Sequence, residues 1–100
     1  MKTSELTGAA LDWAVGKCED TLLDSTMYQY STDWAWGGPI IEREGVDVMH
    51  IRALDLTVGW EATADSGETY YEGPTPLIAA MRCYVTFKLG DEIEVPKEIK

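Results

Sequence analysis

The amino-acid sequence predicts an α+β fold, in which a small antiparallel sheet of three to four strands packs with two main helices. Its 100 residues, 45% of them hydrophobic, suffice for one globular domain. Apolar residues recur at helical spacing near both ends, whereas the middle is rich in strand-forming residues. We expect one domain over residues 1–90, in the order α-β-(short α)-β-β-β-α, and a charged C-terminal tail over 91–100.

The first main helix is expected over Ser4–Glu19, because apolar residues recur there every three or four positions and form one face. These residues are Leu6, Ala10, Trp13, Ala14 and Cys18. Thr3 or Ser4 can cap the helix with a side-chain oxygen. A loop over residues 20–26 and a short strand at Met27–Tyr30 are expected to follow.

The segment from Tyr30 to Pro39, YSTDWAWGGP, is the most unusual in the chain. Its Ser, Thr and Asp offer capping oxygens, and its two glycines permit backbone angles that other residues avoid. Pro39 suits the first position of a helix. We therefore expect a short helix over Ile40–Glu44, ended by Gly45.

Three segments in the middle of the chain are expected to form the sheet. Val46–Ala53 is rich in Val, Met and Ile, and Thr57–Thr63 alternates apolar and polar residues. An Asp-Ser-Gly turn at 65–67 then leads to a returning strand over Glu68–Glu72. Gly73-Pro74 is expected to end that strand.

The second main helix is expected over Pro76–Leu89. Thr75 can cap it, Pro76 suits its first turn, and Gly90 follows its end. Its apolar side is predicted to hold Leu77, Ile78, Met81, Tyr84, Val85, Lys88 and Leu89. The order helix, three strands, helix also occurs in double-stranded-RNA-binding domains, but a shared fold does not carry a shared function.

The net charge of −10 excludes several classes of partner. Residues 1–50 hold three basic and nine acidic side chains, and residues 51–100 hold five and nine, so both halves are acidic. Such a charge disfavours nucleic-acid phosphates and anionic membranes. The longest apolar stretch, Leu77–Met81, is far too short to span a bilayer, and no leader pattern is visible. We expect a soluble cytoplasmic protein.

Neither a metal centre nor an enzyme active site is expected. Cys18 and Cys83 are far apart in the sequence and are interpreted as free thiols. With His50 as the single histidine, they cannot supply the four ligands of a structural zinc site. The sequence contains no nucleophile motif, and it has no second histidine that could act as a base. We therefore expect a non-catalytic protein without cofactors.

Three blocks of the sequence resemble the phage NinX-like family of small proteins. The blocks are Thr3–Gly8 with Ala10–Val15, Ser31–Ala35 with Gly37–Glu44, and Gly73–Arg82. The chain is also distantly similar to phage domains of a helix–sheet–helix sandwich type. The resemblance implies a bacteriophage accessory protein in the host cytoplasm, and it brings no enzymatic activity with it.

The Tyr30–Pro39 segment is the candidate ligand site. Trp34 and Trp36 offer flat surfaces on which a base can stack. Gly37 and Gly38 would leave backbone N–H groups free at a helix start, where a phosphate is favoured. The alternative interpretation is that both indoles fill the core and that Gly-Gly-Pro only begins a helix.

Three further residues complete the candidate site. Thr75, at the start of the last helix, would supply a second phosphate position, and Arg43 and Arg82 would form a charged fork. The predicted ligand-binding residues are Tyr30, Ser31, Thr32, Asp33, Trp34, Trp36, Gly37, Gly38, Arg43, Thr75 and Arg82.

Two functions remain open. The first is counter-defence by sequestering a small nucleotide-like host signal, which the aromatic, glycine-containing segment favours. The second is an acidic protein–protein inhibitor or DNA mimic that blocks a host defence or nucleic-acid enzyme, which the charge of −10 favours. The Tyr30–Pro39 segment is a less common feature than an acidic composition, so we prefer ligand capture as the function. A homodimer or higher homo-oligomer is also compatible with the sequence.

Overall fold

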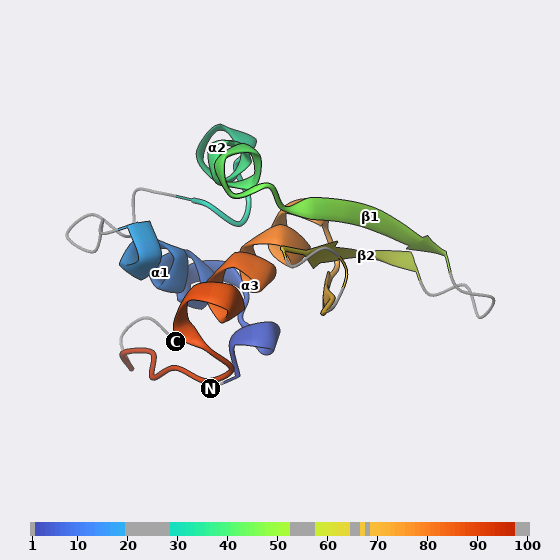
Figure 1. Ribbon diagram of the computed structural model, residues 1–100. Coiled ribbons are helices and arrows are strands. Elements are labelled where there is room, and N and C mark those ends of the chain that lie inside the picture. Colours follow the sequence, from blue (N-terminus) through green and yellow to red (C-terminus); the bar gives the residue numbers. More distant parts are fainter. Residues whose placement is uncertain (1, 20–28, 53–57, 65–66, 68, 98–100) are drawn as a thin grey trace.

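Helix α3 (Pro76–Leu89) runs through the middle of the molecule, and the other elements pack around it (Figure 1). The computed structural model describes residues 2–19, 29–52, 58–64, 67 and 69–97. Within these residues the elements along the chain are η1 (Thr3–Glu5), α1 (Gly8–Glu19), α2 (Trp34–Glu44), β1 (Asp47–Arg52), β2 (Val58–Thr63), β3 (Tyr71–Gly73) and α3. The predicted α+β class is confirmed.

Helix α3 begins and ends where the sequence predicts. The Thr75 hydroxyl oxygen accepts a hydrogen bond from the Ile78 N–H at 3.1 Å, and the N–H of Gly90 bonds to the carbonyl of Thr86. Its buried residues lie on more than one side: Leu77, Ala79, Ala80, Met81, Cys83, Tyr84, Val85 and Thr86. Lys88, predicted on the apolar side, is exposed instead. Residues on several sides of α3 are buried because α1, α2 and the sheet all contact this helix.

The sheet is antiparallel with the order β1-β2-β3. Strands β1 and β2 lie within the predicted ranges, and His50 pairs with Trp60 between them. The third strand is shorter than predicted and includes Gly73. A Cβ atom at Gly73 would lie 2.6 Å from the backbone nitrogen of Ala79, so glycine lets β3 approach α3 closely. Of the predicted turn at 65–67, only Gly67 is described, with φ +92°.

The predicted N-terminal helix is divided in two, which is a correction to the range Ser4–Glu19. Helix η1 ends at Glu5, Leu6 is extended, and α1 begins at Gly8 with φ +56°. The break has a tertiary cause. The carbonyl of Leu6 accepts a hydrogen bond from Nε of Arg82 at 2.7 Å, and the Leu6 side chain is buried.

Helix α2 begins six residues before the predicted range Ile40–Glu44. Asp33 caps it, because an Asp33 carboxylate oxygen accepts a hydrogen bond from the Ala35 N–H at 2.9 Å. Pro39 therefore lies inside the helix rather than at its first position. Gly45 ends the helix with φ +67°, as predicted. The predicted loop 20–26 and residues 27 and 28 of the predicted strand lie outside the described residues, and Tyr30 lies in a turn.

The N-terminal segment and the segment that follows α3 lie side by side below α3 (Figure 1). The N–H of Thr3 bonds to the carbonyl of Asp91 at 2.8 Å, and Lys2 and Glu92 form an antiparallel bridge. Val95 is buried. None of the described helices is long and apolar enough to cross a membrane.

Candidate functional site

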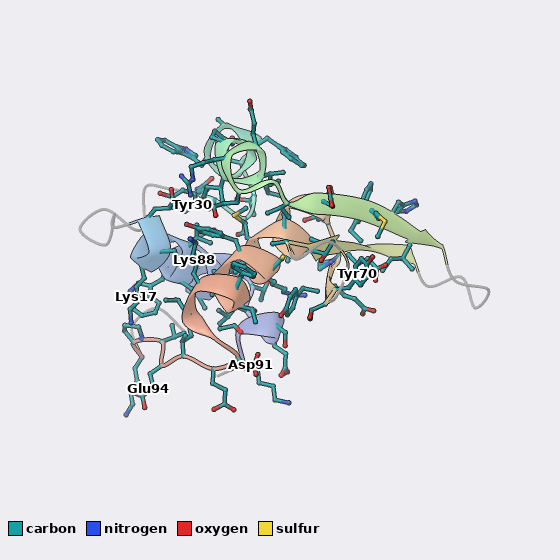
Figure 2. The ribbon with its side chains drawn as sticks, in the orientation of Figure 1. Lys17, Tyr30, Tyr70, Lys88, Asp91 and Glu94 are labelled. Carbon is teal, nitrogen blue, oxygen red and sulfur yellow. The ribbon has the colours of Figure 1, made fainter. Side chains whose placement is uncertain are left out.

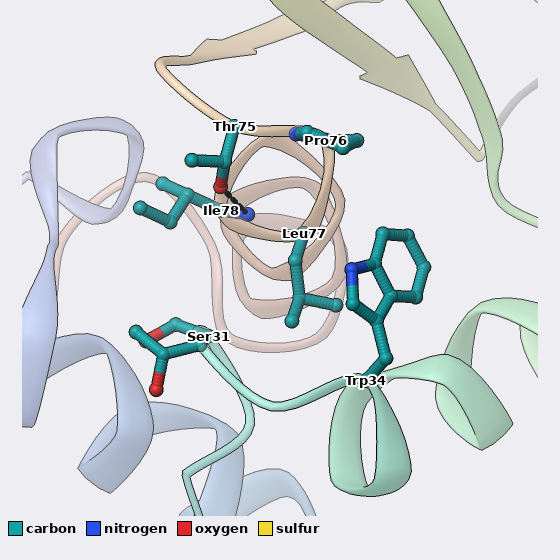
Figure 3. A pocket seen from close by; sticks show the side chains of 7 residues that line it. Ser31, Trp34, Thr75, Pro76, Leu77 and Ile78 are labelled. Atoms are coloured by element: carbon teal, nitrogen blue, oxygen red, sulfur yellow. Dashed lines mark hydrogen bonds between the residues drawn. The ribbon is translucent and has the colours of Figure 1, made fainter.

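A pocket of about 220 Å³ lies between the turn before α2 and the first turn of α3 (Figure 3). Seven residues line it: Ser31, Thr32, Trp34, Thr75, Pro76, Leu77 and Ile78. The structure thus brings Thr75 together with Ser31, Thr32 and Trp34, all four of which are predicted site residues. The other three lining residues, Pro76, Leu77 and Ile78, directly follow Thr75 in the chain. The predicted helix start at Thr75 is the sequence signal that could identify them.

The turn is held in place by bonds to α1 and by a buried tyrosine. The Ser31 N–H donates to a carboxylate oxygen of Asp12 at 2.8 Å. The N–H groups of Thr32 and Asp33 both donate to the carbonyl of Gln29. Tyr30 belongs to the buried core and lies between α2 and the helices below it (Figure 2). Tyr30 and Asp33 therefore position the site without lining it.

Neither tryptophan of α2 fills the core. Trp34 is 54% exposed, and its indole stands beside Leu77 at the pocket, as Figure 3 shows. Trp36 is 40% exposed and packs edge-on against Tyr30, with ring centroids 6.4 Å apart. The interpretation of both indoles as core residues is therefore wrong. Of the two, only Trp34 lines the pocket.

Gly37 and Gly38 lie inside α2 and not at its start, which corrects the predicted phosphate position. The Gly37 N–H donates to the carbonyl of Asp33 at 3.0 Å. A Cβ atom at Gly37 would lie 2.4 Å from the Tyr30 carbonyl oxygen and 2.5 Å from Cδ1 of Leu77. Gly37 thus allows α2 to pack closely on α3. Its role is structural.

The start of α3 offers few free backbone donors. Pro76 has no N–H, that of Ile78 bonds to the Thr75 hydroxyl, and that of Ala79 bonds to the Thr75 carbonyl. Within the described part of the chain, the Leu77 N–H has no hydrogen-bond partner. This helix start is therefore a weaker phosphate site than an uncapped one.

Arg43 lies at the other end of α2, where it joins three helices. Its guanidinium binds the Glu19 carboxylate through two bonds of 2.9 and 2.7 Å, and it also contacts Glu44 and the Tyr84 hydroxyl. The Arg43 hydrogen bonds hold the pKa of Glu19 below its usual value. Tyr84 also donates to Glu19, and burial, followed by this bond, raises the pKa of Tyr84. Arg43 is not part of the pocket.

Arg82 is likewise engaged elsewhere. Its Nε donates to the Leu6 carbonyl, and an Nη donates to the Glu72 carbonyl at 2.8 Å. Burial lowers the pKa of Arg82 from its usual value, although a guanidinium remains charged. The structure brings neither arginine to the pocket, so the predicted charged fork does not form there.

One polar group at the pocket is unusual. The Ser31 side-chain oxygen is buried and has no hydrogen-bond partner among the described residues, while the whole residue is 1% exposed. Most buried polar atoms in proteins are hydrogen-bonded, so this hydroxyl in the wall of the pocket is an exception. The sequence cannot reveal this feature, because pairing depends on tertiary contacts.

The other side chains that could carry chemistry do not form a second candidate site within the described residues. No group of three His, Cys, Asp or Glu side chains among them could hold a metal ion. Cys18 and Cys83 are free thiols, and burial raises the pKa of Cys18 to about 11. His50 packs against the Trp60 ring, with centroids 4.6 Å apart.

A protein-family model matches the chain. The family model described as "Bacteriophage P22, NinX" matches residues 22–88, which is more than half of the sequence. The match covers α2, the sheet and all seven residues that line the pocket. No curated protein matches the chain.

Proposed function

The chain belongs to the bacteriophage P22 NinX family, and we propose that this phage accessory protein captures a small, nucleotide-like host signal in the Trp34 pocket. Capture would lower the free concentration of the signal and so counter a host defence. The protein would act in the host cytoplasm and without catalysis. The observation that carries the proposal is the half-exposed Trp34 indole beside a pocket whose wall includes Ser31, a residue with a buried hydroxyl that has no hydrogen-bond partner among the described residues.

The pocket lining suits binding better than catalysis. Its seven described residues supply three hydroxyl groups, one indole and several apolar side chains, but no imidazole, thiol, carboxylate or amine. General acid–base catalysis needs a titratable group near the reacting atoms. An exposed aromatic ring, in contrast, can stack on a nucleobase, a contact that contributes about 1–3 kcal/mol.

Isothermal titration against a panel of cyclic and ADP-ribose-type nucleotides tests the proposal. We expect at least one nucleotide to bind the wild-type protein and the Trp36→Ala variant, and Trp34→Ala to lose that binding. Trp36→Ala is the matched control, because Trp36 is comparably exposed on the same helix but does not line the pocket. Absence of heat with every nucleotide would overturn the proposal.

A second candidate function is inhibition of a host protein through the sheet. Glu61 pairs directly with Glu72 across β2 and β3, and Met49 and Tyr70 are exposed large side chains nearby. A hollow of about 510 Å³, whose lining includes Asp47, Met49 and Tyr70, adjoins them. These features favour a basic protein partner, such as a nucleic-acid-binding surface.

A pull-down from host lysate at low and high salt tests the second candidate. An electrostatic inhibitor should retain a partner at low salt and release it as the salt concentration rises. Absence of a partner at low salt counts against this function. Sedimentation of the purified protein tests in parallel whether it forms a homo-oligomer.

A further inference from the structure

The polar groups at the Trp34 pocket are uncharged, and this sets the kind of group that the pocket accepts. We propose that it takes the neutral heterocyclic base of its ligand and leaves any phosphate outside. This inference rests on the proposed function, because it assumes that a nucleotide-like molecule binds there. It reverses the expectation from the sequence that helix starts and arginines would hold the phosphate.

Several polar groups at the pocket have no hydrogen-bond partner within the described residues. Among them are the buried Ser31 hydroxyl, the Trp34 indole N–H and the Leu77 backbone N–H. The edge of the Trp34 indole that carries the nitrogen faces Leu77 (Figure 3). Two donors and a hydroxyl complement the ring nitrogens and carbonyl oxygens of a nucleobase.

The charge distribution disfavours a phosphate at the same place. None of the seven lining residues is charged, and the net charge of the chain is −10. Arg43 is bound to two carboxylates and Arg82 to two backbone carbonyls. A phosphate inside the pocket would therefore lose its hydration without gaining a cation, which is costly.

The size of the pocket leads to the same conclusion. Sites that enclose a drug-sized ligand measure about 300–1,000 Å³. At about 220 Å³, this pocket can enclose one part of a nucleotide but not the whole molecule. The part that gains most from the Trp34 ring is the base, because its flat face can stack on the indole.

Titration of matched nucleoside and 5′-monophosphate pairs, one pair for each base in the nucleotide panel, tests the inference. We expect the nucleoside to bind within about threefold of its 5′-monophosphate, with little dependence on salt. Inorganic phosphate should not compete. If the nucleotide binds and the nucleoside does not, or if phosphate competes, the inference is wrong while the proposed function stands. If neither binds, both are wrong.

The Ser31→Ala variant gives an independent readout. Loss of one neutral hydrogen bond should weaken nucleoside binding about fivefold. In the free protein the same change removes an unpaired buried hydroxyl, so the melting temperature should stay the same or rise. Phe87→Ala, at an exposed aromatic residue that does not line the pocket, should leave binding unchanged. A melting temperature that falls with unchanged binding would show that the hydroxyl serves the fold.

Discussion

Nε of Arg82 donates a hydrogen bond to the carbonyl oxygen of Leu6, a residue 76 positions earlier in the chain. An Nη of the same side chain donates to the carbonyl of Glu72, the central residue of β3. One guanidinium therefore ties the N-terminal segment and the sheet to α3. Arg82 is therefore explained by its role in the fold, although its charge alone would suggest that it binds phosphate.

Replacement of Arg82 should destabilise the fold. We expect Arg82→Ala to lower the free energy of unfolding by about 2–4 kcal/mol, because hydrogen bonds from a charged donor contribute about 1.5–3 kcal/mol each. Urea denaturation measures the change. Arg82→Lys, which keeps the charge but not the planar fork, should recover only part of the loss. Full recovery with lysine would show that charge, and not the paired bonds, matters.

The two adjacent glycines of α2 should respond in opposite ways to alanine. Gly37→Ala forces its methyl group against the Tyr30 carbonyl and Leu77, so we expect a loss of about 1–3 kcal/mol in the free energy of unfolding. At Gly38 the new methyl group would lie 3.6 Å from the Trp34 ring, an ordinary contact. Because alanine favours helix, Gly38→Ala should be neutral or stabilising by up to about 1 kcal/mol. Thermal melts of the two variants check both predictions.

The Glu19–Arg43 ion pair should make stability depend on acid pH. Arg43 lowers the pKa of Glu19 below its usual value of 4.5, so the folded protein binds this proton less readily than the unfolded chain. The resulting stabilisation is complete above pH 4.5 and is lost as the pH falls through the lower, folded-state pKa. Urea titrations of the wild-type protein and Glu19→Gln should therefore differ most at neutral pH and converge only once the pH has fallen below the folded-state pKa of Glu19. A difference that does not change with pH would contradict this assignment.

The thiols should be unreactive in the folded protein. Burial raises the pKa of Cys18 to about 11, and Cys83 is fully buried. Since the thiolate is the reactive form, iodoacetamide at pH 8 should modify neither residue at an appreciable rate until urea is added. Mass spectrometry of the labelled protein measures both rates. Rapid labelling of Cys18 under native conditions would contradict the prediction.

Local signals in the sequence predicted the elements whose ends are fixed locally. The bounds of α3 follow from Thr75, Pro76 and Gly90, each of which acts within one helical turn. The division between η1 and α1 could not be predicted in this way, because Arg82 fixes it from the far end of the chain. The sequence places the start of α2 too late, because Pro39 suits a first helical position, whereas the Asp33 cap sets the start.

The candidate site was predicted in part for the same reason. Trp34 and Thr75 are predictable as an aromatic residue and a helix cap, and both line the pocket. For Arg43 and Arg82 the sequence offers only their charge, yet the partners of a long side chain depend on the tertiary structure. The unpaired hydroxyl of Ser31 has no local signature.

The pairing of Lys2 with Glu92 has a practical consequence. In Figure 1 this paired region lies below α3, whereas α2, which carries Trp34, lies above it. A fluorophore or surface tether attached near either residue would therefore leave the mouth of the cavity accessible.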